Sequence, residues 1–143
     1  MYKMTKTFGN EKGFSCCYRN PVAKSHCSLL HGYSLGFKFQ LVCDSLDENG
    51  WVFDFGNFQK VKHVLTDLFD HTVLVSKTDE HLDRFRELDR LDIINLKIVN
   101  AVGCEAFAQI VYNLVKPNFS DRVELESISV FEHSANEATF YGL

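Results

Sequence analysis

The chain lacks a long hydrophobic run, a strongly basic segment and a closely spaced pair of cysteines. No stretch approaches the roughly 18 consecutive apolar residues of a membrane-spanning helix, so no membrane association is expected. No cluster of Lys and Arg exceeds two residues, and 19 acidic against 15 basic residues give a net charge of −4. Proteins that neutralise phosphates are usually more basic, so a nucleic-acid partner is not expected either.

The five cysteines form no Cys-x-x-Cys pair, which argues against a zinc ribbon or finger. Residues 1–6 lack the apolar stretch of a secretory signal. An odd number of cysteines without such a signal predicts free thiols in a reducing cytoplasm.

Linker-like and low-complexity segments are also missing. The chain has two prolines, no Gly/Ser-rich stretch and no internal repeat of useful length. An apolar fraction of 45%, with 13% aromatic residues, is typical of a globular protein. The sequence therefore predicts a single domain over residues 1–143.

Hydrophobic periodicity predicts several strands. Apolar residues alternate with others from Leu35 to Cys43, as in a half-buried strand, and 19–34 is expected to be a loop. Further strands are predicted, in chain order, at 2–8, 14–18, 51–53, 94–98, 127–130 and 138–141.

Two helices are predicted between these strands. Asp54 is a suitable N-cap for a helix ending near Phe69, and a second helix over 107–115 is stopped by Pro117. A short amphipathic helix is possible in the charged segment 76–92. The order of strands, helices and strands predicts an α+β fold, in which two helices cover one face of a four-stranded antiparallel sheet.

Cys27, His31 and the pair Asp70-His71 are candidates for chemistry. A thiol, an imidazole and a carboxylate are the parts of a proton-transfer or nucleophilic site. Each also has a plain structural interpretation, since a lone cysteine often acts as a small buried hydrophobe. His71, just past a predicted helix, could simply interact with the helix dipole.

Two glutamates are candidates for ligand binding. Glu132 shares strand parity with Ile128 and Val130, so it should point to their apolar face, where an acid is costly without a partner. Glu105 lies in the first turn of the second helix, where the helix dipole alone would favour it.

Five segments together resemble the 6-pyruvoyltetrahydropterin synthase and 6-carboxytetrahydropterin synthase family. Residues 27–33 are similar to its Cys-x-x-x-His-Gly-His segment, and 52–55 to its Val-x-Asp-Phe. Residues 68–74 resemble its Leu-Asp-His-x-x-Leu segment. Residues 104–105, at the start of the second helix, resemble the Thr-x-Glu found there in the family, and 130–132 resemble its late Val-x-Glu-Thr strand. The segments occur in the family's order and cover nearly the whole chain.

The resemblance implies the tunnelling fold, a four-stranded antiparallel sheet with two helices on one face that assembles into a barrel, commonly as a hexamer of two trimers. It also implies a cytoplasmic lyase that acts on dihydroneopterin triphosphate without a nucleotide cofactor. The triphosphate is eliminated, and the side chain is rearranged or cleaved to give a 6-carboxy- or 6-pyruvoyl-tetrahydropterin. The motifs are shared by biopterin and queuosine-type pathways.

Roles follow from the same resemblance. Cys27 would be the acid/base thiol, His71 would accept and return protons, and Asp70 would orient His71. Glu132 and Glu105 would accept hydrogen bonds from the amino and ring N–H groups of the pterin, because a carboxylate matches two parallel donors.

The resemblance also implies a zinc ion held by three histidines, of which this sequence keeps only His31. Tyr18 and Tyr33 stand at the other two ligand positions, and a neutral phenol is a poor zinc ligand. One alternative is a rebuilt metal site from Cys16, His26 and His31 that serves a different hydrolytic or lyase reaction. Another is a non-catalytic, metal-free paralogue that keeps the pterin pocket as a binding or assembly module.

Overall fold

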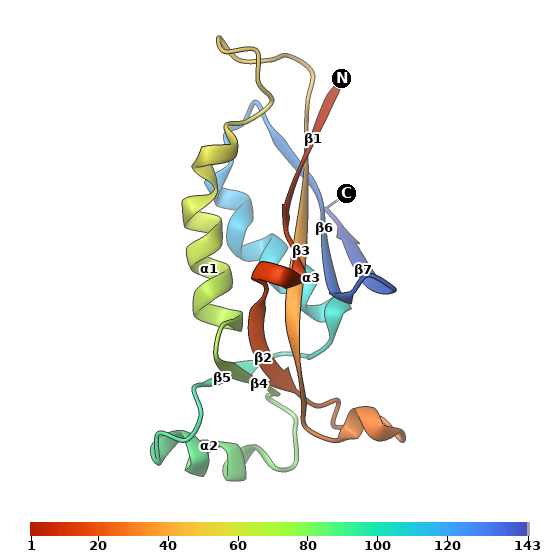
Figure 1. Ribbon diagram of the computed structural model, residues 1–143, viewed down its shortest axis with the longest axis vertical. Coiled ribbons are helices and arrows are strands. Elements are labelled where there is room, and N and C mark those ends of the chain that lie inside the picture. Colours follow the sequence, from red (N-terminus) through yellow and green to blue (C-terminus); the bar gives the residue numbers. More distant parts are fainter. Residues whose placement is uncertain (143) are drawn as a thin grey trace.

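The computed structural model describes residues 1–142, in which seven strands and three α-helices are joined by short 3-10 turns (Figure 1). The strands are β1 (Tyr2–Phe8), β2 (Phe14–Tyr18), β3 (His31–Cys43), β4 (Thr72–Ser76), β5 (Leu96–Val99), β6 (Glu124–His133) and β7 (Asn136–Tyr141). The helices are α1 (Gln59–Phe69), α2 (Leu82–Arg90) and α3 (Cys104–Val115). The 3-10 turns are η1 (Asn10–Lys12), η2 (His26–Ser28), η3 (Phe55–Phe58) and η4 (Lys116–Asn118).

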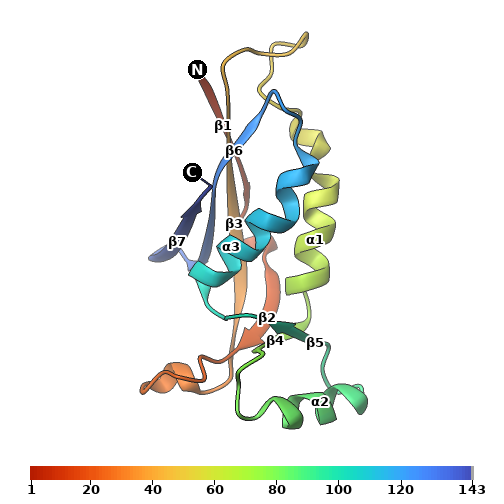
Figure 2. The ribbon, with the colours of Figure 1, turned by 180° about the vertical axis from the view of Figure 1, so that it is seen from behind.

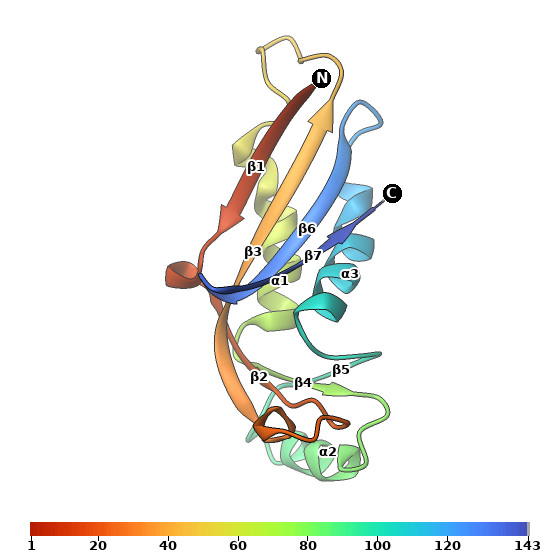
Figure 3. The same cartoon turned by 90° about the vertical axis from the view of Figure 1, so that its right-hand side faces the viewer.

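The long strand β3 is the spine of a single sheet. Its first part pairs antiparallel with β2, its second part pairs antiparallel with β1, and β6 runs along its other edge. The strand order is β5-β4-β2-β3-β6-β7, with β1 beside the second part of β3. Figure 3 shows β1, β3, β6 and β7 side by side, with the helices behind them.

Helices α1 and α3 cover one face of this sheet, as Figure 2 shows from behind. Phe37 of β3, Phe69 of α1 and Phe107 of α3 are fully buried where the sheet and both helices meet. The Phe37 and Phe69 ring centroids are 4.9 Å apart, and those of Phe69 and Phe107 are 5.2 Å apart. Within residues 1–142, no helix is both long enough and apolar enough to cross a membrane.

The predicted α+β arrangement is confirmed, and so are both long helices and the short one, α2. Asp54 caps the start of the first helical segment, since its side chain accepts a hydrogen bond from the Gly56 N–H at 2.8 Å. The last two strands are found as β6 and β7, and the strand predicted at 94–98 is β5. The four antiparallel strands β1, β3, β6 and β7 correspond to the predicted four-stranded sheet.

Three local predictions were wrong. The expected loop 19–34 ends early, because Tyr18 of β2 pairs with His31 and draws 31–34 into β3. Residues 51–53 form no strand, because the backbone of Trp51 is hydrogen-bonded back to Asp47. The sheet also has seven strands where four were predicted, because β2, β4 and β5 extend it beyond the first part of β3.

Strand β4 escaped prediction because all five of its residues are buried. A strand that is covered on both faces shows no alternation of apolar and polar residues. Helix α2 packs below β4 and β5, where Phe85 joins Val73 and Val75 in a second, smaller apolar cluster (Figure 1).

Candidate functional site

A cavity of about 430 Å³ lies where the end of β2, the η2 turn, the start of β3, the start of α3 and the β6–β7 hairpin meet. The sequence-predicted residues that line it are Cys27, His31, Glu105 and Glu132, together with Tyr18 and Tyr33. Asn20 and Gly103, which the sequence analysis did not name, also line it, as do His26 of the alternative metal site and Cys104, which precedes Glu105. The structure therefore brings most of the predicted site into one pocket.

The pairing of β2 with β3 sets three rings side by side. Tyr18 lies opposite His31 and Cys16 lies opposite Tyr33, and directly opposed residues in an antiparallel pair project to the same face. The Tyr18 ring centroid is 5.7 Å from that of His31 and 5.9 Å from that of Tyr33. His31 and Tyr33 meet edge-on at 5.2 Å.

A hydrogen bond joins Tyr18 to the carboxylate of Glu132 across this cluster. The phenol donates to Glu132 Oε1 over 3.1 Å, and Tyr18 is only 5% exposed. Burial, followed by nearby Cys104 and the Glu132 carboxylate, raises the pKa of Tyr18. Burial and Glu132 likewise raise the pKa of Tyr33, so both phenols are neutral at ordinary pH.

These residues do not fit a zinc ion. Two neutral phenols stand beside His31, and the buried one is already committed to Glu132. Zinc prefers imidazole, thiolate and carboxylate ligands. In the part of the chain that the structure describes, no three His, Cys, Asp or Glu side chains are grouped so that they could hold a metal ion.

The alternative set of Cys16, His26 and His31 does not form a site either. His26 and His31 line the cavity, whereas Cys16 does not. Cys16 is 5% exposed, and burial raises the pKa of its thiol to about 12. A thiol must be deprotonated to bind a metal, so Cys16 is a poor candidate.

His31 has one ring nitrogen fixed by the backbone. Its Nδ1 lies 2.6 Å from the carbonyl oxygen of Leu29, and because a carbonyl can only accept, Nδ1 carries the hydrogen. In the neutral ring, Nε2 is then the nitrogen that can accept a proton.

Cys27 is the accessible thiol of the cavity. It lies in the η2 turn, where its N–H donates to Ser25 Oγ at 3.3 Å and its carbonyl accepts from the Asn20 N–H at 2.9 Å. Cys104 also lines the cavity but is buried, and burial, with the charges of Glu132 and Glu105, raises its pKa to about 12. The thiolate is the reactive form, so Cys27 is the better candidate for proton transfer.

Asp70 and His71 form a pair outside this cavity. His71 Nδ1 lies 3.1 Å from Asp70 Oδ1, as expected for a carboxylate that orients an imidazole. Both residues are tied to β2 through Ser15, whose N–H donates to Asp70 and whose carbonyl accepts from the His71 N–H. The His71 side chain is 86% exposed and lines a separate hollow, so a single chain does not bring it to Cys27.

Sequence reasoning missed Asn20 and named His26 only for the alternative metal site, because both lie in an irregular segment without periodicity. It also missed the Tyr18–Glu132 hydrogen bond, which joins residues 114 positions apart. The signal that could have indicated the bond was the acid at the apolar face of β6, which needs a buried donor.

Comparison with known proteins finds a family model that matches nearly the whole chain. The family model for 6-pyruvoyl tetrahydropterin synthase matches residues 7–142. No curated protein matches the chain by sequence.

Several solved structures share the fold. The uncharacterized protein WS1659 from Wolinella succinogenes has a TM-score of 0.85 at 18% identity, covering 99% of this chain and 98% of its own. The 6-pyruvoyl tetrahydropterin synthase of Plasmodium vivax has a TM-score of 0.69 at 13% identity, with 98% of each chain covered. That of Caenorhabditis elegans has a TM-score of 0.67 at 18% identity, covering 99% and 96%.

Proposed function

Because the chain belongs to the 6-pyruvoyl tetrahydropterin synthase family, we propose that its cavity binds a reduced pterin and that the protein is a lyase acting on dihydroneopterin triphosphate. The observation that carries the proposal is the convergence of an accessible thiol, Cys27, and two carboxylates, Glu105 and Glu132, on one cavity. The volume of about 430 Å³ suits a small heterocyclic ligand.

The carboxylates are the proposed anchors of the pterin ring. A pterin presents an amino group and ring N–H groups as parallel donors, and a carboxylate can accept two such bonds. Glu132 accepts one bond from Tyr18, and an ionised carboxylate retains capacity for further donors. Glu105, at the first turn of α3, is exposed at the cavity and is free to approach the ligand.

Cys27 is the proposed proton carrier at the side chain of the substrate. Elimination of triphosphate removes a proton from one carbon of the side chain and expels the phosphate oxygen, with its electron pair, from the next. The enol that results regains a proton when it forms the carbonyl product. A thiol near the reacting carbons can deliver or remove these protons.

The pair Asp70-His71 is proposed to act on the cavity of a neighbouring copy. Its imidazole is oriented by Asp70 and largely exposed, as a base that serves another chain would be. Within the same chain, the imidazoles that line the cavity are those of His26 and His31. The proposed site therefore combines Cys27 of one copy with His71 of another.

The proposed chemistry uses side chains alone. A zinc ion polarises substrate oxygens where it is bound, but Tyr18 and Tyr33 do not suit it as ligands. Neutral phenols can still donate hydrogen bonds to a substrate oxygen, and Tyr33 lines the cavity.

Turnover of dihydroneopterin triphosphate tests the proposal. Protein stripped of metal by chelation is incubated with the substrate, and mass spectrometry distinguishes a 6-pyruvoyl from a 6-carboxy product. We expect release of triphosphate by the wild type and by Cys43→Ala, whose thiol lines neither the cavity nor the hollow of His71, and loss of release in Cys27→Ala. Equal turnover in Cys27→Ala and the wild type would contradict the assignment.

The second candidate is a non-catalytic pterin-binding protein. The packed rings of Tyr18, His31 and Tyr33 favour it, because they fill the space in which the family's metal ligands converge. In that case the pterin binds but no triphosphate is released, with or without added zinc.

A further inference from the structure

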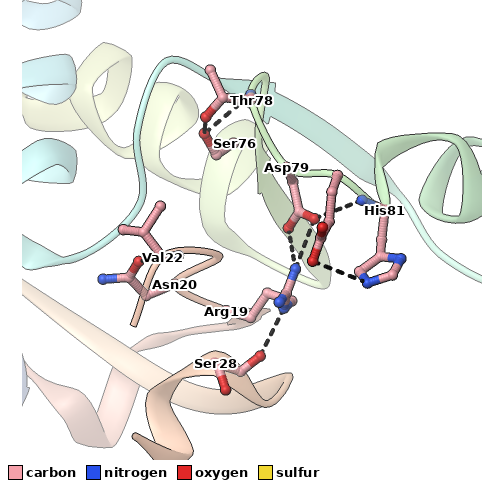
Figure 4. A network of polar contacts seen from close by, with 9 residues as sticks. Arg19, Asn20, Val22, Ser28, Ser76, Thr78, Asp79 and His81 are labelled. Atoms are coloured by element: carbon pink, nitrogen blue, oxygen red, sulfur yellow. Dashed lines mark hydrogen bonds and ion pairs between the residues drawn. The ribbon is translucent and has the colours of Figure 1, made fainter. Parts of the chain in front are cut away.

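Arg19 and Asp79 form a largely buried ion pair beside the cavity (Figure 4). Arg19 Nη1 lies 2.7 Å and 2.8 Å from the two carboxylate oxygens of Asp79. The Asp79 side chain is 0% exposed and that of Arg19 is 13% exposed. A buried carboxylate is tolerated only where donors surround it, so Asp79 depends on the guanidinium of Arg19 as its partner.

The second donor of Arg19 reaches the residue next to Cys27. Arg19 Nε donates to the carbonyl oxygen of Ser28 over 2.7 Å, in the η2 turn that carries Cys27. Arg19 directly follows Tyr18, whose side chain lines the cavity. One guanidinium therefore connects the end of β2 with the peptide unit beside the proposed catalytic thiol.

Asp79 is itself held in place by backbone hydrogen bonds. Its Oδ1 accepts the His81 N–H at 2.9 Å, just before α2, and its own N–H donates to the Ser76 carbonyl at 2.9 Å. Ser76 Oγ in turn lies 3.4 Å from the carbonyl oxygen of Asn100. The network thus spans β4, α2 and the segment that leads to α3, as the sticks in Figure 4 show in part.

Hydrophobic packing contributes little to the position of residues 20–30, the Cys27 segment. Val22, Leu29 and Leu30 are 81%, 66% and 48% exposed. A segment with few buried apolar contacts depends on its polar contacts for order. The Arg19 Nε–H bond to the Ser28 carbonyl ties this segment to the end of β2, whereas the Asn20 N–H bond to the Cys27 carbonyl closes the segment on itself.

We infer that Arg19 is a positioning residue that, braced by Asp79, fixes the η2 turn so that Cys27 lies at the cavity. Arg19 donates from two nitrogens, Nη1 to the Asp79 carboxylate and Nε to the Ser28 carbonyl. Lysine keeps the charge near Asp79 but has no donor at the Nε position, so it loses the second bond. The inference deepens the proposed function, since it concerns the thiol to which that function assigns proton transfer.

The test reads the position of Cys27 without substrate, so its failure and the failure of the proposed lyase activity are separable. Amide hydrogen exchange of residues 20–30 is compared in the wild type, Arg19→Lys and the control Lys97→Gln, which breaks a partly exposed ion pair with Asp67 outside this segment. We expect exchange of this segment to rise about tenfold or more in Arg19→Lys and to stay at the wild-type rate in Lys97→Gln.

A spectroscopic readout separates positioning from general stability. With Cys17 replaced by Ser in every variant, a trifluoromethyl label on Cys27 should give one narrow ¹⁹F resonance, which broadens or splits in Arg19→Lys. Unchanged exchange and an unchanged resonance in Arg19→Lys would overturn the inference. It would also be overturned if exchange rose equally throughout the protein, in proportion to a lower unfolding midpoint.

The wild type provides a measurement that does not depend on how any variant folds. Of the five arginines, Arg19 is the one whose Nε–H donates in the described structure, so one slowly exchanging arginine Nε–H signal is expected. Absence of any such signal would overturn the inference.

Discussion

At the scale of single residues, Tyr18 and Tyr33 change the chemistry of the cavity. Each stands where the resemblance implies a histidine ligand, and each keeps its proton because burial and Glu132 raise its pKa. Tyr18 uses that proton to bind Glu132 at 3.1 Å. In this chain Tyr18 is therefore a hydrogen-bond donor to a proposed pterin anchor.

Replacing both tyrosines by histidine should restore metal binding. The double variant Tyr18→His/Tyr33→His places three imidazoles near one another on paired strands, and imidazole is a preferred zinc ligand. We expect the double variant to retain about one zinc per chain after gel filtration, by elemental analysis, while each single variant and the wild type retain far less. Stoichiometric zinc in the wild type would contradict the assignment.

The buried thiols of Cys16 and Cys104 predict a loss of stability at alkaline pH. Burial raises both pKa values from 9.0 to about 12, so the unfolded chain loses these protons first. Stability is therefore intact below about pH 9 and falls as the pH rises towards 12, by at most about 1.4 kcal/mol per pH unit for each thiol.

Urea unfolding midpoints between about pH 8 and pH 11 measure this effect. The double variant Cys16→Ala/Cys104→Ala should show a shallower alkaline decline, whereas Cys27→Ala, which removes an exposed thiol, should keep the wild-type slope. Identical slopes in all three proteins would refute the role of the buried thiols.

At the scale of elements, α3 supports the site through its buried face. Phe107 is fully buried and meets the Tyr18 ring edge-on at 5.0 Å and the Phe69 ring at 5.2 Å. It therefore packs α3 against both the cavity wall and α1.

Removing this ring should cost much more than removing an exposed side chain of the same helix. Phe107→Ala should lower the free energy of unfolding by about 3–5 kcal/mol, because it leaves a cavity in the core. Leu114→Ala, at a site that is 51% exposed, should change it by less than about 0.5 kcal/mol. Denaturant titrations give both values, and similar losses would contradict this packing account.

The sequence predicted elements well where one face is buried and the other is not. The alternation of β3 and the helical periodicity of α1 and α3 identify these elements from local pattern alone. Strand β5 was predicted at 94–98, but its parallel pairing with β4 joins distant segments and left no local signal. Strand β4 is buried on both faces, so local pattern could not identify it.

The site, like the fold, was predictable only in part from the sequence. Cys27, His31, Glu105 and Glu132 were named from motifs and converge on the cavity. The Arg19–Asp79 pair was not found, because it joins residues 60 positions apart and neither belongs to a motif. Asp70 and His71 were named, but the sequence could not indicate that one chain keeps them apart from Cys27.

At the scale of the whole molecule, the sheet has open edges. Within the described residues β1 pairs only with β3 and β7 pairs only with β6. Such edges offer unpaired backbone groups to another chain, and pairing β1 of one copy with β7 of the next would extend the sheet towards a closed barrel. This agrees with the proposed oligomer, which could bring His71 of one copy to Cys27 of another.

Mixing two inactive variants tests the shared site. Cys27→Ala and His71→Ala are each expected to lose turnover, whereas a refolded mixture should regain activity, because some cavities then combine an intact Cys27 with an intact His71. A refolded mixture of Cys27→Ala with Cys27→Ala/His71→Ala is the control and should stay inactive. If the first mixture also stays inactive while its oligomers form, the two residues do not act together across copies.

The central claim is that the cavity recognises a pterin through Glu132 without a metal, and calorimetric titration tests it most directly. Metal-free wild-type protein and the variant Glu132→Gln are each titrated with a reduced pterin. The variant keeps the shape of the side chain and an oxygen that can accept the hydrogen bond of Tyr18. The account predicts about one pterin bound per chain and an affinity reduced about tenfold or more in Glu132→Gln, since a charged acceptor is lost. No binding by the wild type, or equal binding by both proteins, would contradict it.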